Sequence, residues 1–100
     1  MASLEKISLD AYVLDSLMPD LVGHDRHASA LVVYLFLWRK TRGGSKAAVL
    51  SHSMVAEGTG LAKRSAQAAL DRLSSRELIQ VHRTGPTAAA KVTLSCHWRR

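Results

Sequence analysis

Apolar residues recur at helical spacing along the first half of the chain, which predicts a mainly helical protein. The first expected helix covers residues 8–18 and is closed by Pro19, and a polar connection follows over residues 20–25. The second expected helix covers residues 27–41. A buried strand is the alternative there because the segment is rich in β-branched and aromatic residues, but its length and its basic C-terminal end favour a helix. Its apolar residues point in almost every direction, so its own domain, or also a second subunit, must cover it.

Three further elements are expected between residues 47 and 75. Residues 47–50 form a brief strand, and Ser51 is a suitable N-cap for a short helix that breaks at residues 58–60. The next helix covers residues 62–75. Its buried stripe has the i, i+3, i+4, i+7 spacing and consists of Ala66, Ala69, Leu70 and Leu73. Its opposite face carries Lys63, Arg64, Gln67, Asp71 and Arg72.

Alternation of apolar and polar residues replaces the helical spacing after Glu77. Residues 79–82 and 90–94 alternate between two faces, and residues 83–87, which include a Gly-Pro pair, lie between them. This pattern predicts a β-hairpin with a basic tip. The expected fold class is therefore mainly α with a small β-hairpin.

Residues 59–73, with the sequence TGLAKRSAQAALDRL, resemble the turn and recognition helix of bacterial winged helix-turn-helix regulators. Residues 51–57 look like the supporting helix of that family, and residues 74–79 look like its passage into the wing. The resemblance covers about residues 28–94. It implies a winged helix-turn-helix fold and sequence-specific binding of double-stranded DNA, in transcriptional control or in plasmid and phage replication and maintenance.

Side chains in the first turn of the expected 62–75 helix are the candidate base-reading residues, because one α-helix fits the major groove. Arg and Lys can donate to guanine, and Gln pairs with adenine. The candidates are Lys63, Arg64, Ser65 and Gln67, with Arg64 and Gln67 the best specificity residues. The family usually has Ser or Thr where this chain has Ala62, so a capping side chain is missing. An ordinary solvated helix face is the alternative reading of these residues.

A second set of residues is expected to contact the DNA backbone from the supporting helix, the reading helix and the hairpin. Basic side chains at a hairpin tip can follow the phosphates or enter a minor groove, and a helix N-terminus binds anions. The set consists of Ser51, His52, Ser53, Arg72, Arg83, Thr84 and Lys91.

Charge is divided unevenly along the chain, whose formal net charge is +6. Residues 1–38 hold two basic and five acidic residues, whereas residues 39–100 hold twelve basic and three acidic residues. A strongly basic segment favours a polyanionic partner, because basic side chains release counterions from phosphates. A solvated basic surface without a partner is the alternative that charge alone leaves open.

Composition restricts the remaining possibilities. A chain of 100 residues with 47% hydrophobic residues and one cysteine is a small globular protein, with the bacterial cytoplasm as its expected compartment. No secretory signal or membrane-spanning run is visible. The histidines and Cys96 lack the spacing of a zinc site, and we find no catalytic motif, so we expect neither an enzyme nor a metal, cofactor or small-molecule effector.

A homodimer is expected, because a single recognition helix reads only one half-site. We divide the chain into an N-terminal helix and connection over residues 1–26, a candidate dimerisation element, and the winged helix-turn-helix domain over residues 27–100. The candidate interface consists of Leu4, Ile7, Leu14, Leu17, Met18 and exposed parts of residues 30–38. The equally weighted alternative is that these residues complete the core of the monomer. A winged-helix module that binds another protein, as an adaptor in a replication or segregation complex, is the alternative function.

Overall fold

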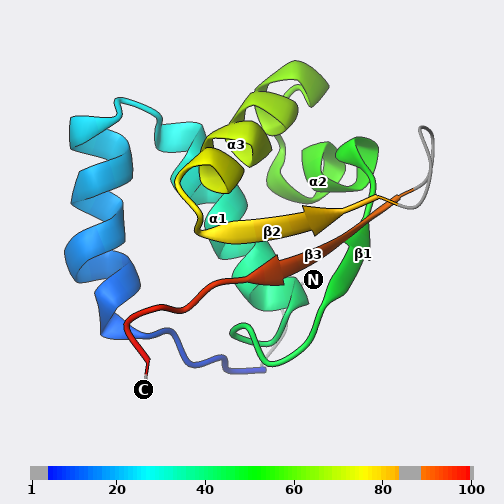
Figure 1. The fold of residues 1–100 in the computed structure, drawn as a ribbon. Coiled ribbons are helices and arrows are strands. Elements are labelled where there is room, and N and C mark those ends of the chain that lie inside the picture. Colours follow the sequence, from blue (N-terminus) through cyan, green and yellow to red (C-terminus); the bar gives the residue numbers. More distant parts are fainter. Residues whose placement is uncertain (1–4, 84–88, 100) are drawn as a thin grey trace.

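The structure, a computed structural model, describes residues 5–83 and 89–99. Helical elements occupy most of the described chain, and a small three-stranded antiparallel sheet lies against them (Figure 1). The elements in chain order are η1 (Val13–Leu17), η2 (Pro19–His24), α1 (Ala28–Lys40), β1 (Ala48–Leu50), α2 (His52–Thr59), α3 (Lys63–Ser75), β2 (Ile79–His82) and β3 (Ala90–Leu94). The mainly helical class with a C-terminal hairpin is confirmed.

Helix α1 is the centre of the core, and the helical prediction for this segment is confirmed. It packs against η2, α2 and α3, so elements of the same chain cover most of its surface (Figure 1). Among the large apolar side chains of α1, that of Val32 is exposed, at 40% of its surface. No helix in the described part of the chain combines the length and the apolar character that spanning a bilayer requires. The buried residues of α1 are Ala30, Leu31, Val33, Tyr34, Leu37 and Trp38.

The N-terminal helical region does not end at Pro19, and the expected polar connection over residues 20–25 is wrong. Two wide-turned π-helical segments, η1 and η2, follow one another up to His24. Pro19 is tolerated because it begins η2, where its missing N–H is least costly. Leu21 then continues the apolar face at a spacing of four residues, and this face is buried against the core. Its members are Val13, Leu17 and Leu21.

Helix α2 continues through Gly58 and Thr59, so the predicted break at residues 58–60 is placed too early. The helix ends at Gly60, whose φ of 82° is in the left-handed region that favours glycine. Gly58 has a different role. A β-carbon at Gly58 would overlap the ring of Phe36, so glycine is needed for the close approach of α2 to α1.

The hairpin strands β2 and β3 have the predicted bounds, and β1 joins them in a sheet of order β1-β3-β2. Ala48 pairs with Val92 and Leu50 with Ala90, while Val81 also pairs with Val92. The inner face of the sheet is apolar and packs toward the helices. Its outer face carries the more exposed residues Val49, Gln80, His82 and Lys91.

Acidic residues of the N-terminal region form ion pairs with basic residues from later in the chain. Asp10 accepts hydrogen bonds of 2.7 Å from Trp98 Nε1 and from Arg99 Nε. These two bonds hold the pKa of the Asp10 carboxyl below its ordinary value. Arg76 donates to both Asp20 and Asp25. These contacts between acidic and later residues therefore connect the first helical region to the rest of the molecule.

The residues of the candidate dimer interface are divided by the structure. Leu17 is 3% exposed and belongs to the core, and Met18 packs against that core. Ile7 and Leu14 remain exposed, at 56% and 45% of their surface. Leu4 lies outside the described residues. Core completion thus accounts for part of the set, and dimerisation stays a prediction for the exposed part.

Candidate nucleic-acid interface

Helix α3 presents an apolar stripe to the core and a polar face to solvent, as its spacing predicts. The four predicted stripe residues are all buried. Lys63, Arg64 and Gln67 are exposed, and Ser65 is partly buried. Among the described residues, no carboxylate oxygen lies within 4.0 Å of the charged nitrogens of Lys63 or Arg64. Two free cations therefore stand in the first turn of the helix.

The start of α3 lacks a side-chain cap. Ala62 occupies the N-cap position with extended backbone angles and offers no oxygen to the first-turn N–H groups. The preceding turn is well defined: the Thr59 hydroxyl donates to the carbonyl oxygen of Val55 at 2.7 Å and accepts from the N–H of Leu61 at 3.2 Å. A rigid turn thus holds a helix end whose backbone donors are free for an external acceptor.

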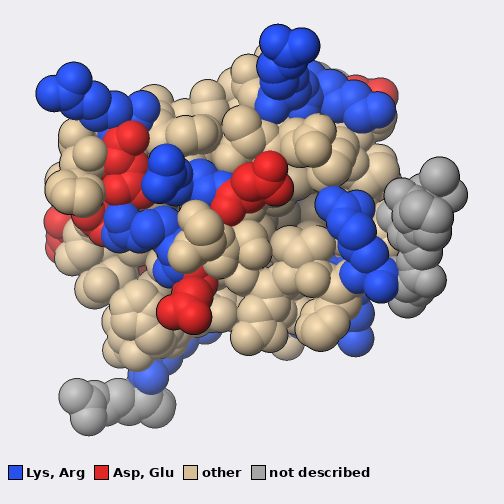
Figure 2. All heavy atoms as spheres, turned by 45° about the horizontal axis from the view of Figure 1, so that its top comes forward, with Lys and Arg blue, Asp and Glu red and all other residues tan. Residues whose placement is uncertain are grey.

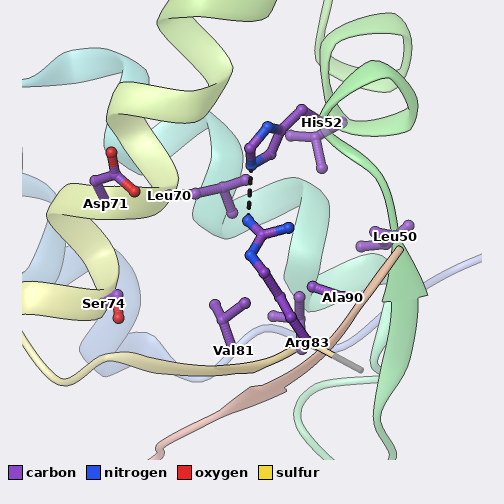
Figure 3. Close-up of a pocket in the computed structure, with 10 residues that line it drawn as sticks. Leu50, His52, Leu70, Asp71, Ser74, Val81, Arg83 and Ala90 are labelled. Atoms are coloured by element: carbon purple, nitrogen blue, oxygen red, sulfur yellow. Dashed lines mark hydrogen bonds between the residues drawn. The ribbon is translucent and has the colours of Figure 1, made fainter. Parts of the chain in front are cut away.

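Helix α2 begins with the predicted cap, since the Ser51 hydroxyl oxygen accepts a hydrogen bond of 3.1 Å from the N–H of Met54. The next residue, His52, is joined to the hairpin. Arg83 extends from the end of β2 to His52, and a guanidinium nitrogen lies 3.0 Å from the imidazole Nε2 (Figure 3). With this geometry the ring nitrogen accepts from the arginine when His52 is neutral. Two predicted backbone-contacting residues, 31 positions apart, therefore form one basic group.

A hollow of about 340 Å³ lies between α3, the start of α2 and the base of the hairpin (Figure 3). We call it the hairpin hollow. Its apolar floor consists of Leu50, Val55, Leu70, Val81, Ala90 and Val92. Its polar residues are His52, Asp71, Ser74 and Arg83. The sequence gives no local sign of it, because the floor comes from β1, α2, α3, β2 and β3.

Not all predicted backbone-contacting residues gather here. Lys91 pairs with His82 and Val49 across the sheet and lies on the outer face, away from the Arg83 side chain. Arg72 is exposed on α3, but its charge acts on Asp25 of the N-terminal region. Ser53 is exposed on the first turn of α2. Thr84 lies outside the described residues.

The basic side chains on the face to which α3 contributes form separate groups. Acidic and uncharged side chains stand between them, so this face is not uniformly basic (Figure 2). Asp71 is an exposed acid on α3 itself. Its carboxylate repels phosphates from the middle of the helix and leaves the first turn as the more favourable side for a polyanion.

One cluster of potential metal ligands lies away from α3. Asp20, His24 and Asp25 bring ligand atoms within 4.8 Å of one another. Arg76 already binds both carboxylates, and a hydrogen bond with His24 contributes most to lowering the pKa of Asp25. Arginine thus provides the positive charge that balances this acidic pair. The pairing was not predicted, since the residues lie more than 50 positions apart.

Comparison with known proteins gives no family: no protein-family model, no curated protein and no solved structure matches this chain significantly.

Proposed function

We propose that the protein binds double-stranded DNA in a sequence-specific manner, as a small transcriptional regulator with a winged helix-turn-helix fold. The observation that carries the proposal is the first turn of α3, where Lys63 and Arg64 are exposed and free of carboxylate partners. Gln67 is exposed one turn further along. A helix with these side chains enters the major groove with its N-terminal end, and Arg64 and Gln67 read guanine and adenine.

The DNA backbone is held by Arg83, His52 and the first N–H groups of α2 and α3. Arg83 and His52 lie together beside α3, and the N–H groups of α3 lie at its own N-terminus, so contacts at these two places fix its depth and angle in the groove. The carboxylate of Asp71 disfavours a phosphate directly beside it on α3. The hairpin of β2 and β3, with Arg83 at the end of β2, lies along the backbone or in the adjacent minor groove.

Two copies of the chain bind two half-sites, because one reading helix of this size supplies limited affinity and specificity. Ile7 and Leu14, which remain exposed on the N-terminal region, are the apolar contacts that we assign to the dimer. The bacterial cytoplasm, where the DNA is located, is the compartment that this function requires.

The first test compares DNA binding by wild type and by the Lys63→Ala/Arg64→Ala variant on fragments selected from a random-sequence library. Loss of two base or phosphate contacts should weaken binding at least about tenfold. Each lost phosphate contact should lower the slope of log K against log salt by about 0.9. The control is Lys6→Ala/Lys46→Ala, which removes the same charge from exposed positions outside α2, α3 and the hairpin strands. Equal weakening of DNA binding by both variants would show that the protein binds DNA only by nonspecific electrostatic attraction.

A protein-interaction module is the second candidate, and the interspersed acidic side chains around α3 favour it (Figure 2). Such a module binds its partner protein through mixed charges and gives no salt-dependent retention of DNA. Unchanged DNA retention by the Lys63/Arg64 variant would remove α3 as the reading element, and absence of any selected DNA sequence would favour the adaptor role.

A further inference from the structure

The hairpin hollow has the construction of a small-molecule site, although the sequence predicts no effector. We propose that it binds a small amphipathic monocarboxylate, with the apolar body on the floor of the hollow and the carboxylate on Arg83. The volume of about 340 Å³ lies within the range of ligand pockets. Five elements meet at this position, so the walls belong to the packed fold.

The floor supplies the apolar part of the recognition. Leu50, Val55, Ala90 and Val92 are almost fully buried and belong to the core, whereas Val81 is partly exposed. An apolar ligand placed there removes its own apolar surface and the exposed part of Val81 from water, which stabilises the complex in proportion to the area covered. The same floor has no polar side chain that an apolar ligand would leave unsatisfied.

Arg83 supplies the anchor for the carboxylate. One of its terminal nitrogens is directed to His52, and no carboxylate oxygen of the described residues lies within 4.0 Å of the guanidinium. A guanidinium has five N–H donors, so several stay free for a ligand after the bond to His52. A carboxylate matches this fork in a bidentate arrangement.

Asp71 and Ser74 restrict the class of ligand. They project from α3 on the other side of the hollow from Arg83 (Figure 3). The carboxylate of Asp71 disfavours a second negative charge, so a single acid is favoured over dicarboxylates and doubly charged phosphate monoesters. Ser74 can donate or accept one further hydrogen bond.

Occupation of the hollow also affects DNA binding, and this consequence rests on the proposed function. Arg83 cannot direct the same N–H groups to a ligand carboxylate and to a phosphate. A bound monocarboxylate therefore weakens DNA binding by competition for this arginine, so the ligand is a negative effector of DNA binding.

The test uses 2-naphthoate as the probe, with the neutral 2-naphthamide as its matched comparison, and the full chain without DNA. Methyl resonances of Leu70, Val81 and Val92 should shift in a saturable manner with 2-naphthoate, while those of Val13 and Leu17 stay unchanged. The amide should bind about tenfold more weakly, since it lacks the charge-assisted bond to Arg83. Arg83→Gln should remove this preference for the acid, and Lys91→Gln, on the outer sheet face, should preserve it.

Val81→Phe fills the hollow with a larger side chain that suits a strand, and it should abolish the shifts of Leu70 and Val92 while the Val13 and Leu17 resonances show an intact fold. Saturable shifts elsewhere, equal affinity for acid and amide, or no shifts at millimolar 2-naphthoate would overturn the proposal. Selection of DNA by the chain is measured in a separate experiment. A chain that binds 2-naphthoate in the hollow but selects no DNA would refute the regulator function and leave the ligand site standing.

Discussion

At the scale of single residues, Gly58 has a structural role that differs from the one the sequence pattern predicts. The sequence pattern predicts a helix break, because Gly58 and Gly60 flank Thr59. Only Gly60 has the left-handed backbone that requires glycine. Gly58 is helical and lies against the ring of Phe36, a residue 22 positions earlier in the chain. A contact so distant in sequence leaves no local signal.

Gly58→Ala should destabilise the protein by about 1–3 kcal/mol, because the new methyl group overlaps the Phe36 ring and α2 must move away from α1. Chemical denaturation measures the loss. Gly23→Ala is the matched control: it places the same methyl group in a helical segment with no heavy atom within 4 Å of it. It should be neutral or stabilise by up to about 1 kcal/mol. A Gly58→Ala variant as stable as wild type would show that the ring moves aside at no cost.

At the scale of elements, α2 and α3 differ in how they begin, and the sequence predicts both beginnings. Ser51 caps α2 through the N–H of Met54. Ala62 leaves α3 without a cap, although its backbone is in the extended region that a capping residue adopts. An uncapped reading helix retains free N–H groups for a phosphate, at the cost of some helix stability.

Ser51→Ala should lower the free energy of unfolding by about 1 kcal/mol, and Ala62→Ser should raise it by a similar amount, because the new hydroxyl accepts from a first-turn N–H of α3. The two variants are compared by urea denaturation with wild type. If Ala62→Ser also weakens the binding of selected DNA, the free N–H donors of α3 take part in that binding. Unchanged stability in Ala62→Ser would mean that water already satisfies these donors equally well.

At the scale of the whole molecule, long-range ion pairs connect both ends of the N-terminal helical region to later parts of the chain. Asp10 connects its beginning to Trp98 and Arg99, and Arg76 connects its end to Asp20 and Asp25. Stacking of Tyr12 on Trp98, with ring centroids 4.5 Å apart, adds an apolar contact beside Asp10. Charge counts along the chain reveal the asymmetry but not these pairings, which depend on the folded arrangement.

The lowered pKa of Asp10 makes this connection sensitive to acid. A carboxyl whose pKa is lower in the folded state than in the unfolded state stabilises the protein at a pH above 3.8, the ordinary pKa of the group. This contribution is lost as the pH falls through the lowered pKa. Asp10→Asn should therefore be less stable than wild type at neutral pH, with the difference shrinking toward strong acid.

Urea denaturation from pH 7 to pH 2 measures this difference, and Asp15→Asn, at an exposed position of the same helical region, controls for the removal of a carboxylate. A difference between wild type and Asp10→Asn that stays constant over the whole range would contradict a charge-dependent role. Equal pH dependence in the two Asn variants would assign the effect to net charge.

The sequence by itself determined the order of elements, the buried stripe of α3, both hairpin strands and the exposed first turn of the proposed reading helix. These features depend on spacing within one segment, where apolar periodicity and capping residues act over a few positions. Tertiary structure decided the helix that continues past Pro19, the contact of Gly58 with Phe36, the joining of Arg83 to His52 and the hollow beside α3. Each of these requires side chains from distant segments to meet, and packing of the whole chain, rather than local propensity, determines which segments meet.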